Sequence, residues 1–222
     1  MIVIGLTGSI GMGKSTAANM LRRMGIPVSD ADAIVHNLMT RGGDAVAPVD
    51  AAFPGVVKDG AIDRAALGQA VFGNPEALRR LERIVHPLVG RDRDRFLRQS
   101  AQRRLRMVVL DVPLLYETGG ADRCDTVILV SAPAMIQQGR VMRRPGMTLE
   151  RLQNIRRQQM PNGEKRRRAE FVAETGLGRN VTLRALEQAV RLIARRKPRH
   201  WPPAPQPRWR TPRYYARSRP RY

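Results

Sequence analysis

The chain has 222 residues, a formal net charge of +21 and 42% hydrophobic residues, which leaves room for one domain with an inserted lobe. Its single cysteine, Cys124, excludes an intrachain disulfide and fits a reducing compartment. No apolar run reaches about 18 residues and MIVIGLTG lacks the basic region of a signal peptide, so we expect a cytoplasmic protein without a membrane span.

Short apolar segments alternate with helical patterns along much of the chain. Strands are expected at residues 2–6, 26–29, 107–112, 126–131 and 170–174. Helical periodicity is present in KSTAANMLRRMG, MIQQGRVMRR, TLERLQNIRRQQ and VTLRALEQAVRLIARR. This alternation predicts a three-layer α/β fold with a central parallel five-stranded sheet and right-handed crossovers.

Two regions depart from this alternation. Residues 33–105 read as helical throughout, with a bend at His86-Pro87, and we assign them to an inserted helical lobe. From Lys197 to the end, the chain holds eight of its 40 Lys and Arg residues and seven of its 16 prolines, with no acid. We expect residues 197–222 to form a disordered basic tail, whose mixture of Arg, Trp and Tyr is compatible with contacts to nucleic acid or other polyanions.

A glycine-rich motif follows the first expected strand. Residues 8–15, GSIGMGKS, match the phosphate-binding pattern GxxxxGK[ST] between a strand and a helix. Such a loop turns successive backbone N–H groups toward phosphate oxygens, and the helix that follows adds its positive end. The alternative is a glycine-rich turn with a surface lysine. We assign to the binding of a nucleoside triphosphate, which the family resemblance described below identifies as ATP, the residues Gly8, Gly11, Met12, Gly13, Lys14, Ser15 and Thr16.

Two side chains of this site have further expected roles. Lys14 can reach the β- and γ-phosphates, and the Ser15 hydroxyl can bind Mg²⁺. A second metal-side group is Asp111, which ends the apolar segment MVVLD as the acid of a Walker-B strand does. The alternative for Asp111 is that it caps the segment that follows it.

A pair of acids, Asp30 and Asp32, follows the second expected strand. Ligands of doubly wound sheets bind at the carboxyl ends of the strands, so an acid there can face the γ-phosphate and an acceptor hydroxyl. A carboxylate can orient that hydroxyl and take its proton, which favours a small-molecule kinase. Charge balance and helix capping are the alternatives. We expect Asp30 to cap or orient and Asp32 to face the acceptor. Asp32 and Lys14, which can reach the phosphates, are the two residues that we expect to be catalytic.

Five segments together resemble a known family in order and spacing. They are GLTGSIGMGKST (5–16), DAD (30–32), HPL (86–88), DVPLLYE (111–117) and QMPNGEKRRRAEFV (159–172). The chain is similar in these segments to dephospho-CoA kinases, over about residues 1–193. Two positions depart from the family pattern: Arg144-Pro145-Gly146 stands where RDG is usual, and Glu174-Thr175 stands where DN is usual.

The resemblance implies a P-loop, nucleotide-kinase-like fold with a helical lid at about 140–165 and an acceptor-binding helical insertion at about 33–105. It implies transfer of the ATP γ-phosphate, with Mg²⁺, to the ribose 3′-hydroxyl of dephospho-CoA, the last step of coenzyme A synthesis. It also places the catalytic base at Asp32 and ATP-binding lid arginines at Arg140 and Arg144. The positive segment KRRR (165–168) would face the two anionic substrates.

Two other functions remain compatible with the residues. One is a related P-loop nucleoside or nucleotide kinase with another acceptor. The helical insertion selects the acceptor, and its sequence pattern does not identify which molecule it binds. The other is a nucleic-acid-binding ATPase, which the net charge of +21 and the basic tail suggest. The function that we expect is neither of these but the one that the family resemblance implies, carried out by a monomer.

Overall fold

A computed structural model describes residues 1–199. It divides into two compact units: unit 1 comprises Met1–Val28 and the chain from Arg104 onward, and unit 2 comprises Ser29–Arg103. Within the described residues, no helix is long and apolar enough to cross a membrane. The tail expected at 197–222 lies outside the described residues from 200 onward.

The sheet has five strands, as the alternating pattern predicts, and their order is β2-β5-β1-β6-β7. Their bounds are β1 Ile2–Thr7, β2 Val28–Asp30, β5 Met107–Asp111, β6 Thr126–Ser131 and β7 Phe171–Glu174. The pairings of β1 with β5, of β1 with β6 and of β6 with β7 are parallel. β2 begins at Val28, two residues after residue 26, where the sequence predicted the start of the strand. The carbonyl of Pro27 nevertheless accepts a hydrogen bond from Val109 N at 2.9 Å.

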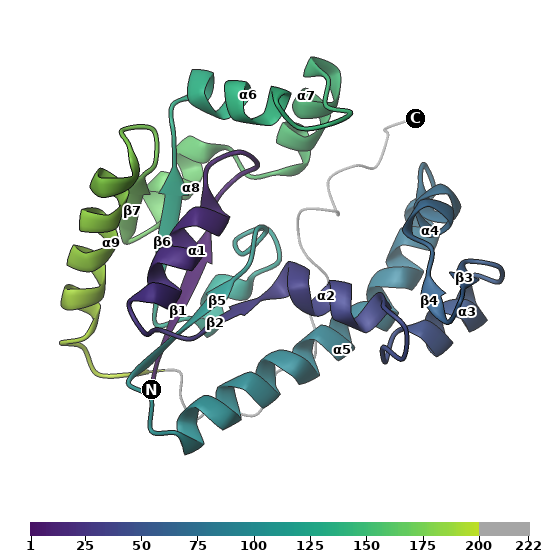
Figure 1. The fold of residues 1–222 in the computed structure, drawn as a ribbon, viewed down its shortest axis with the longest axis horizontal. Helices are drawn as coiled ribbons and strands as arrows, with labels where there is room; N and C mark the ends of the chain where they lie inside the picture. The colour runs from purple at the N-terminus through teal and green to yellow at the C-terminus, as the bar shows by residue number, and fades with distance from the viewer. Residues whose placement is uncertain (200–222) are drawn as a thin grey trace, which may run out of the picture. The chain divides into compact units, whose positions relative to one another are not determined.

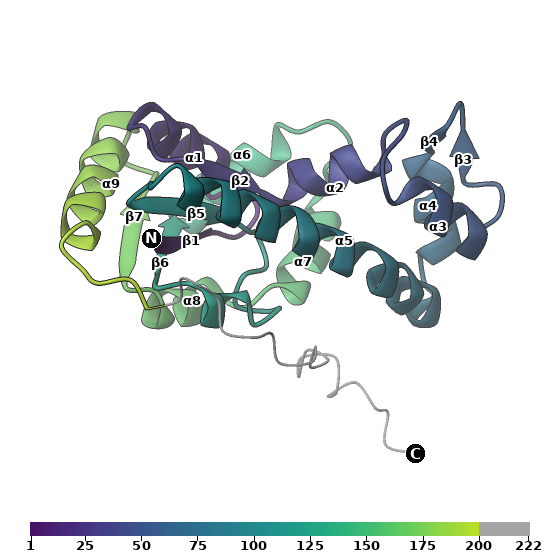
Figure 2. The same cartoon turned by 90° about the horizontal axis from the view of Figure 1, so that it is seen from below.

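Helices cover both faces of this sheet, as Figure 2 shows: α1 (Lys14–Arg23) and α9 (Arg179–Ile193) lie on one side and α8 (Asn162–Arg168) on the other. All six residues of β1 are buried, because a strand covered on both faces needs apolar side chains at every position. The core on the α1 and α9 face includes Ile4, Leu21, Leu186 and Ile193. A short 3₁₀ helix, η1, spans Gly120–Arg123.

The region expected to form a lid, at about 140–165, contains the end of α6 (Ala134–Met142), all of α7 (Leu149–Gln158) and the start of α8, and α6 and α7 lie next to one another in Figure 1. They follow β6 and precede α8, and residues 143–148 connect them. The Thr148 hydroxyl caps α7 by accepting a hydrogen bond from Arg151 N at 3.2 Å. The last described residues pack beyond α9, since Arg199 N donates to the carboxylate of Asp125.

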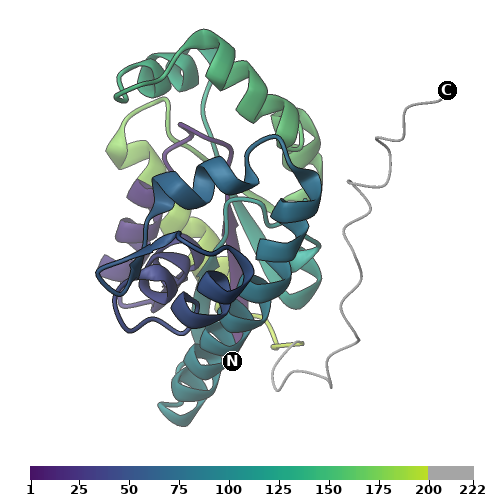
Figure 3. The same ribbon diagram turned by 90° about the vertical axis from the view of Figure 1, so that its right-hand side faces the viewer.

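Unit 2 contains α2 (Ala31–Met39), α3 (Val46–Ala52), β3 (Val57–Lys58), β4 (Ala61–Ile62), α4 (Arg64–Val71) and α5 (Pro75–Gln102). α2, α3 and α4 each pack against the long α5, the blue to teal helix of this unit in Figure 3. The expectation of helix alone in this region was wrong at one place, where β3 and β4 form an antiparallel hairpin. Asp59 and Gly60 make its turn with φ of 50° and 75°, a backbone that Asp-Gly adopts readily.

Candidate active site

The phosphate-binding motif forms the connection between β1 and α1. Gly11 and Gly13 have φ of 74° and 90°, values that side chains disfavour, and Gly13 is the residue that precedes α1. A Cβ at Gly8 would lie 2.8 Å from the carbonyl oxygen of Val130, so glycine is needed there for close packing. Gly11 and Gly13 are therefore needed for their backbone conformation, and Gly8 is needed because a side chain would not fit there.

Several backbone N–H groups of this loop have no acceptor within residues 1–199. They belong to Gly11, Gly13, Lys14, Ser15 and Thr16. The last three begin α1, whose first N–H groups lack intrahelical partners and carry the positive end of the helix dipole. Together these groups can accept the oxygens of a phosphate chain.

The structure brings Lys14 and Asp111 together from two motifs far apart in the sequence. Lys14 Nζ lies 2.7 Å from Asp111 Oδ1, and the side chains are 13% and 1% exposed. The β1–β5 register causes this, because it sets Asp111 beside Leu6 at the end of β1 that leads into the phosphate loop. The next described helix after Asp111, η1, begins nine residues later, so Asp111 does not start a helix.

The residues expected to hold Mg²⁺ fit that ion by their chemistry. Mg²⁺ binds hard oxygen ligands and usually keeps waters and substrate phosphates besides one or two protein groups. Ser15 offers an exposed hydroxyl in the first turn of α1, and Asp111 offers a buried carboxylate. The described residues contain no cluster of three or more His, Cys, Asp or Glu.

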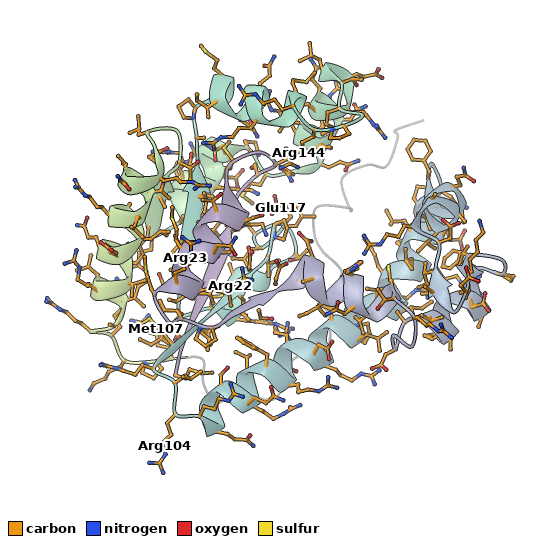
Figure 4. All side chains as sticks on the ribbon, in the orientation of Figure 1. Arg22, Arg23, Arg104, Met107, Glu117 and Arg144 are labelled. Atoms are coloured by element: carbon orange, nitrogen blue, oxygen red, sulfur yellow. The ribbon has the colours of Figure 1, made fainter. Side chains whose placement is uncertain are left out.

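Of the two arginines expected to bind ATP, Arg140 makes hydrogen bonds within unit 1 and Arg144 is exposed. Arg140 Nη1 donates to Thr175 Oγ1 at 2.9 Å, and Nη2 donates to the Thr175 carbonyl at 2.6 Å. Arg144 lies on the segment after α6, where Figure 4 labels it. Thr175 supplies both acceptors.

Three side chains that the sequence analysis did not single out contact the phosphate loop. Gln159 accepts a hydrogen bond from Ile10 N at 3.2 Å, while Gln137 donates to the Ile10 carbonyl at 2.8 Å. Thr175 donates to the Met12 carbonyl at 2.7 Å. Gln159 and Thr175 lay in or beside segments already noted, but nothing in the local pattern indicated which part of the chain they would contact.

The basic segment 165–168 does not face solvent as a whole. Lys165 is fully buried, with its Nζ 2.8 Å from Glu117 Oε1, so the expectation that it would face anionic substrates was wrong. Glu117, labelled in Figure 4, belongs to the loop that follows Asp111. Arg166 pairs with Glu174 and is therefore engaged at the end of β7.

Asp30 and Asp32 belong to unit 2, at the start of α2. Asp30 Oδ1 accepts hydrogen bonds from Asp32 N at 3.0 Å and from Ala33 N at 3.2 Å, which confirms that Asp30 caps this helix. Asp32 occupies the first turn and its side chain is exposed. Its role toward an acceptor hydroxyl stays a prediction.

Comparisons with known proteins agree on one family. A family model described as dephospho-CoA kinase matches residues 2–177. A dephospho-CoA kinase from Paramagnetospirillum magneticum is 63% identical over 75% of this chain and 78% of its own length. One from Rhodospirillum rubrum is 57% identical over 90% of this chain and 95% of its own.

Solved structures share the fold. A crystal structure of a Thermus thermophilus protein has a TM-score of 0.73 and 39% identity, and the match covers 86% of this chain and 96% of that one. A dephospho-CoA kinase structure from Campylobacter jejuni has a TM-score of 0.61 at 22% identity, with the same coverage, and supports the fold. The α/β arrangement of unit 1 is thus the one that these proteins adopt.

Proposed function

The chain belongs to the dephospho-CoA kinase family, and from this premise we propose how its residues transfer the ATP γ-phosphate to the 3′-hydroxyl of dephospho-CoA. The observation that carries the proposal is the pairing of Lys14 with Asp111 beside the phosphate loop. It unites a phosphate-binding lysine and a metal-side carboxylate, the two charged groups that P-loop phosphoryl transfer requires.

The phosphate chain of ATP binds along the loop. The N–H groups of Gly11 and Gly13 and those of the first turn of α1 donate to its oxygens, and Gly8 and Met12 complete the loop that presents them. Lys14 exchanges its contact with Asp111 for contacts with the β- and γ-phosphates. Because Lys14 is only 13% exposed, its charge acts on the phosphates with little screening by water.

Ser15 and Asp111 are the residues that would hold Mg²⁺, which neutralises charge on the β- and γ-phosphates when bound. Ser15 offers its hydroxyl and Asp111 its carboxylate, once Lys14 has turned to the phosphates. The backbone N–H group of Thr16 follows that of Ser15 in the first turn of α1 and is the last of the loop's donors that we assign to the phosphates. Arg140 and Arg144 are the lid arginines that we assign to ATP, of which only Arg144 is exposed in this structure.

Asp32 is the group that we assign to the acceptor. Its carboxylate takes the proton of the 3′-hydroxyl as the oxygen of that hydroxyl forms a bond to the γ-phosphorus. The bond between the γ-phosphorus and the oxygen that bridges to the β-phosphate breaks, and its electron pair leaves with ADP. Asp32 is supported in this role by its exposure and by the capping contact of Asp30, which leaves Asp32 without that structural task.

A test with purified protein compares acceptors at equal concentrations. With ATP and Mg²⁺, dephospho-CoA should yield coenzyme A and ADP in equal amounts, while adenosine and other nucleosides should yield far less. Lys14→Ala should abolish product formation, because it removes the charge that the phosphates contact. Lys197→Ala, which changes an exposed lysine after α9, is the matched control. Faster phosphorylation of a nucleoside would identify a related kinase instead.

We also propose that the protein acts as a cytoplasmic monomer. Residues 197–222 would contact nucleic acid or other polyanions through their positive charges and aromatic rings, a proposal that rests on composition alone. Sedimentation at several protein concentrations tests the monomer. A nucleic-acid-binding ATPase would instead hydrolyse ATP faster when single-stranded nucleic acid is added and dephospho-CoA is omitted.

A further inference from the structure

Two buried side chains hold the outer side of the phosphate loop by its carbonyl groups. The Ile10 carbonyl accepts a hydrogen bond from Gln137 Nε2 at 2.8 Å, and the Met12 carbonyl accepts one from Thr175 Oγ1 at 2.7 Å. Gln137 is 4% exposed and Thr175 is 7% exposed. Since water hardly competes for these donors, the two carbonyls keep their directions.

The direction of each carbonyl fixes the N–H group that follows it. In a trans peptide, the C=O and N–H groups point in opposite directions across a planar unit. The Ile10 carbonyl points to Gln137, so Gly11 N–H points the other way, and in the same manner the contact of Met12 with Thr175 turns Gly13 N–H away. Within residues 1–199, neither glycine N–H has an acceptor. Both are therefore oriented for an external anion.

Arginines of the lid helices in turn hold these two side chains. Arg156 Nη2 donates to Gln137 Oε1 at 2.6 Å, so the amide nitrogen of Gln137 is the end that faces the loop. Arg140 Nη1 donates to Thr175 Oγ1 at 2.9 Å, so the Thr175 hydroxyl proton is directed to a carbonyl, and the Met12 carbonyl at 2.7 Å is nearer than that of Ser131 at 3.3 Å. Each contact thus runs from a lid arginine, through one neutral side chain, to one peptide of the loop.

We propose that Gln137 and Thr175 are positioning residues for phosphoryl transfer, which aim the N–H groups of Gly11 and Gly13 at the phosphates of ATP. The inference rests on the ATP site proposed above. Arg140 and Arg156 make the orientation of these N–H groups depend on the lid helices.

Packing around Gly11 supports the same arrangement. A Cβ at Gly11 would lie 2.5 Å from Val141 Cγ2 and 3.0 Å from the Gln137 carbonyl, so α6 lies directly on the loop. The amide of Ala132, just before α6, also lies 3.1 Å from Met12 Sδ. The loop and α6 are therefore in contact at several points, and a change in α6 has a direct route to the loop backbone.

The first test changes only the donor of Gln137. In Gln137→Glu, the carboxylate can still accept from Arg156 but cannot donate to the Ile10 carbonyl. We expect Mg²⁺-ADP, measured by calorimetry at pH 8, to bind about tenfold more weakly, the effect of losing roughly one hydrogen bond. The loss should shrink as the pH falls and the carboxyl regains a proton to donate. Gln138→Glu places the same charge on the exposed neighbour and is the control.

The second test changes only the hydroxyl of Thr175. Thr175→Val keeps the shape of the side chain and removes the donor, so we expect about a tenfold rise in the KM for ATP with an unchanged KM for dephospho-CoA. Thr175→Ser restores the hydroxyl and should restore the KM for ATP. The control is Thr182→Val, because the buried Thr182 also donates to a backbone carbonyl, that of Glu174, but does not contact the loop.

The outcomes separate this inference from the kinase proposal. Unchanged ADP affinity in Gln137→Glu would overturn the positioning role of Gln137, and an unchanged KM for ATP in Thr175→Val would overturn that of Thr175. An equal loss in the matching control, Gln138→Glu or Thr182→Val, would overturn the same role. A lower kcat and melting temperature with unchanged nucleotide affinity would also overturn it, because that pattern belongs to a merely structural role. If the unchanged protein binds ADP but does not phosphorylate dephospho-CoA, the kinase proposal fails while the ADP measurements still decide this one.

Discussion

Lys165 Nζ and Glu117 Oε1 lie 2.8 Å apart, with the side chains 0% and 7% exposed. Glu117 Oε1 also accepts a hydrogen bond from Met160 N at 2.8 Å, and within the described residues Glu117 Oε2 has no hydrogen-bond partner. The lysine is within ion-pair distance, although its N–H groups are not aligned for a hydrogen bond. This pair joins the loop after Asp111 to helix α8 at the cost of burying two charges.

Removing one partner of this pair should strongly destabilise the protein. Lys165→Met leaves the Glu117 carboxylate buried without its counter-charge, and we expect a loss of about 3–5 kcal/mol in the free energy of unfolding. Equilibrium unfolding in urea measures the loss. Lys58→Met is the control, because Lys58 pairs with Asp63 at the surface, where water screens the charges and the loss in unfolding free energy should be far smaller.

A second substitution, Glu117→Gln, made in the Lys165→Met protein should recover much of this stability, because the glutamine side chain is neutral and its amide oxygen can still accept from Met160 N. A double-mutant cycle gives the coupling between the two residues directly. If the double variant were no more stable than Lys165→Met alone, the two charges would not depend on one another, and packing of the lysine chain would explain the loss.

The sequence predicts those parts of the molecule that local pattern controls. The phosphate loop follows from glycine spacing between a strand and a helix, and the five strands follow from their apolar runs. The cap at Asp30 follows from its place before α2. The hairpin turn at Asp59-Gly60 also has a clear local signal, which helical patterns on both sides obscured.

Contacts between distant segments are not predictable in this way. Nothing near Thr175 indicates that its hydroxyl contacts Met12, 163 residues away. Likewise, Lys165 belongs to a run of four basic residues, and only the packing of α8 on the sheet distinguishes the one that is buried. The register between β1 and β5, which joins Lys14 to Asp111, depends on a strand pairing across about half the chain.

Asp30 and Asp32 should respond differently to substitution. Asp32→Asn should lower kcat by about 10²–10⁴-fold with little change in ATP affinity, as expected when a positioned base is lost. Asp30→Ala should cost about 1 kcal/mol of stability through the lost cap, whereas Asp30→Asn should keep most of it, since Asn also caps helices. Steady-state kinetics and thermal unfolding measure the two effects. Weaker ATP binding with normal kcat in Asp32→Asn would make Asp32 a metal-side residue.

Burial raises the pKa of Tyr116 to about 12, with the positive charge of Arg168 opposing the rise. The folded protein therefore keeps the phenol proton at pH values where the unfolded chain, with a pKa near 10, releases it. The contribution of this group to stability is complete below about pH 10 and is lost as the pH rises toward 12. In Tyr116→Phe, the fall in unfolding free energy between pH 10 and 12 should be smaller. If the unfolding free energy fell equally steeply with pH in the unchanged protein and in Tyr116→Phe, burial would not raise the pKa of the Tyr116 phenol.

The last prediction concerns where the enzyme can be shortened. Arg196 pairs with the Glu170 carboxylate and lies 5.3 Å from the ring centroid of Phe171, while Arg199 N contacts Asp125. The hydrogen bond that Arg196 donates to the Glu170 carboxylate is the main cause of the lowered pKa of Glu170. A chain that ends after Arg199 keeps all these contacts, so its kinase activity should stay within a few-fold of the full chain. Ending after Arg195 should cost up to about 1 kcal/mol more stability, because the ion pair is largely exposed.

The stability that Glu170 supplies is present above the usual pKa of a glutamate and is lost as the pH falls through its lowered value. The difference in unfolding free energy between the chains that end after Arg199 and after Arg195 should therefore become smaller below about pH 4. Urea unfolding at several pH values measures this difference. Both chains lack the Arg, Trp and Tyr residues after position 199, so both should lose most affinity for single-stranded nucleic acid at low salt. Retained nucleic-acid affinity together with lost kinase activity in the chain that ends after Arg199 would show instead that the removed residues serve the enzyme.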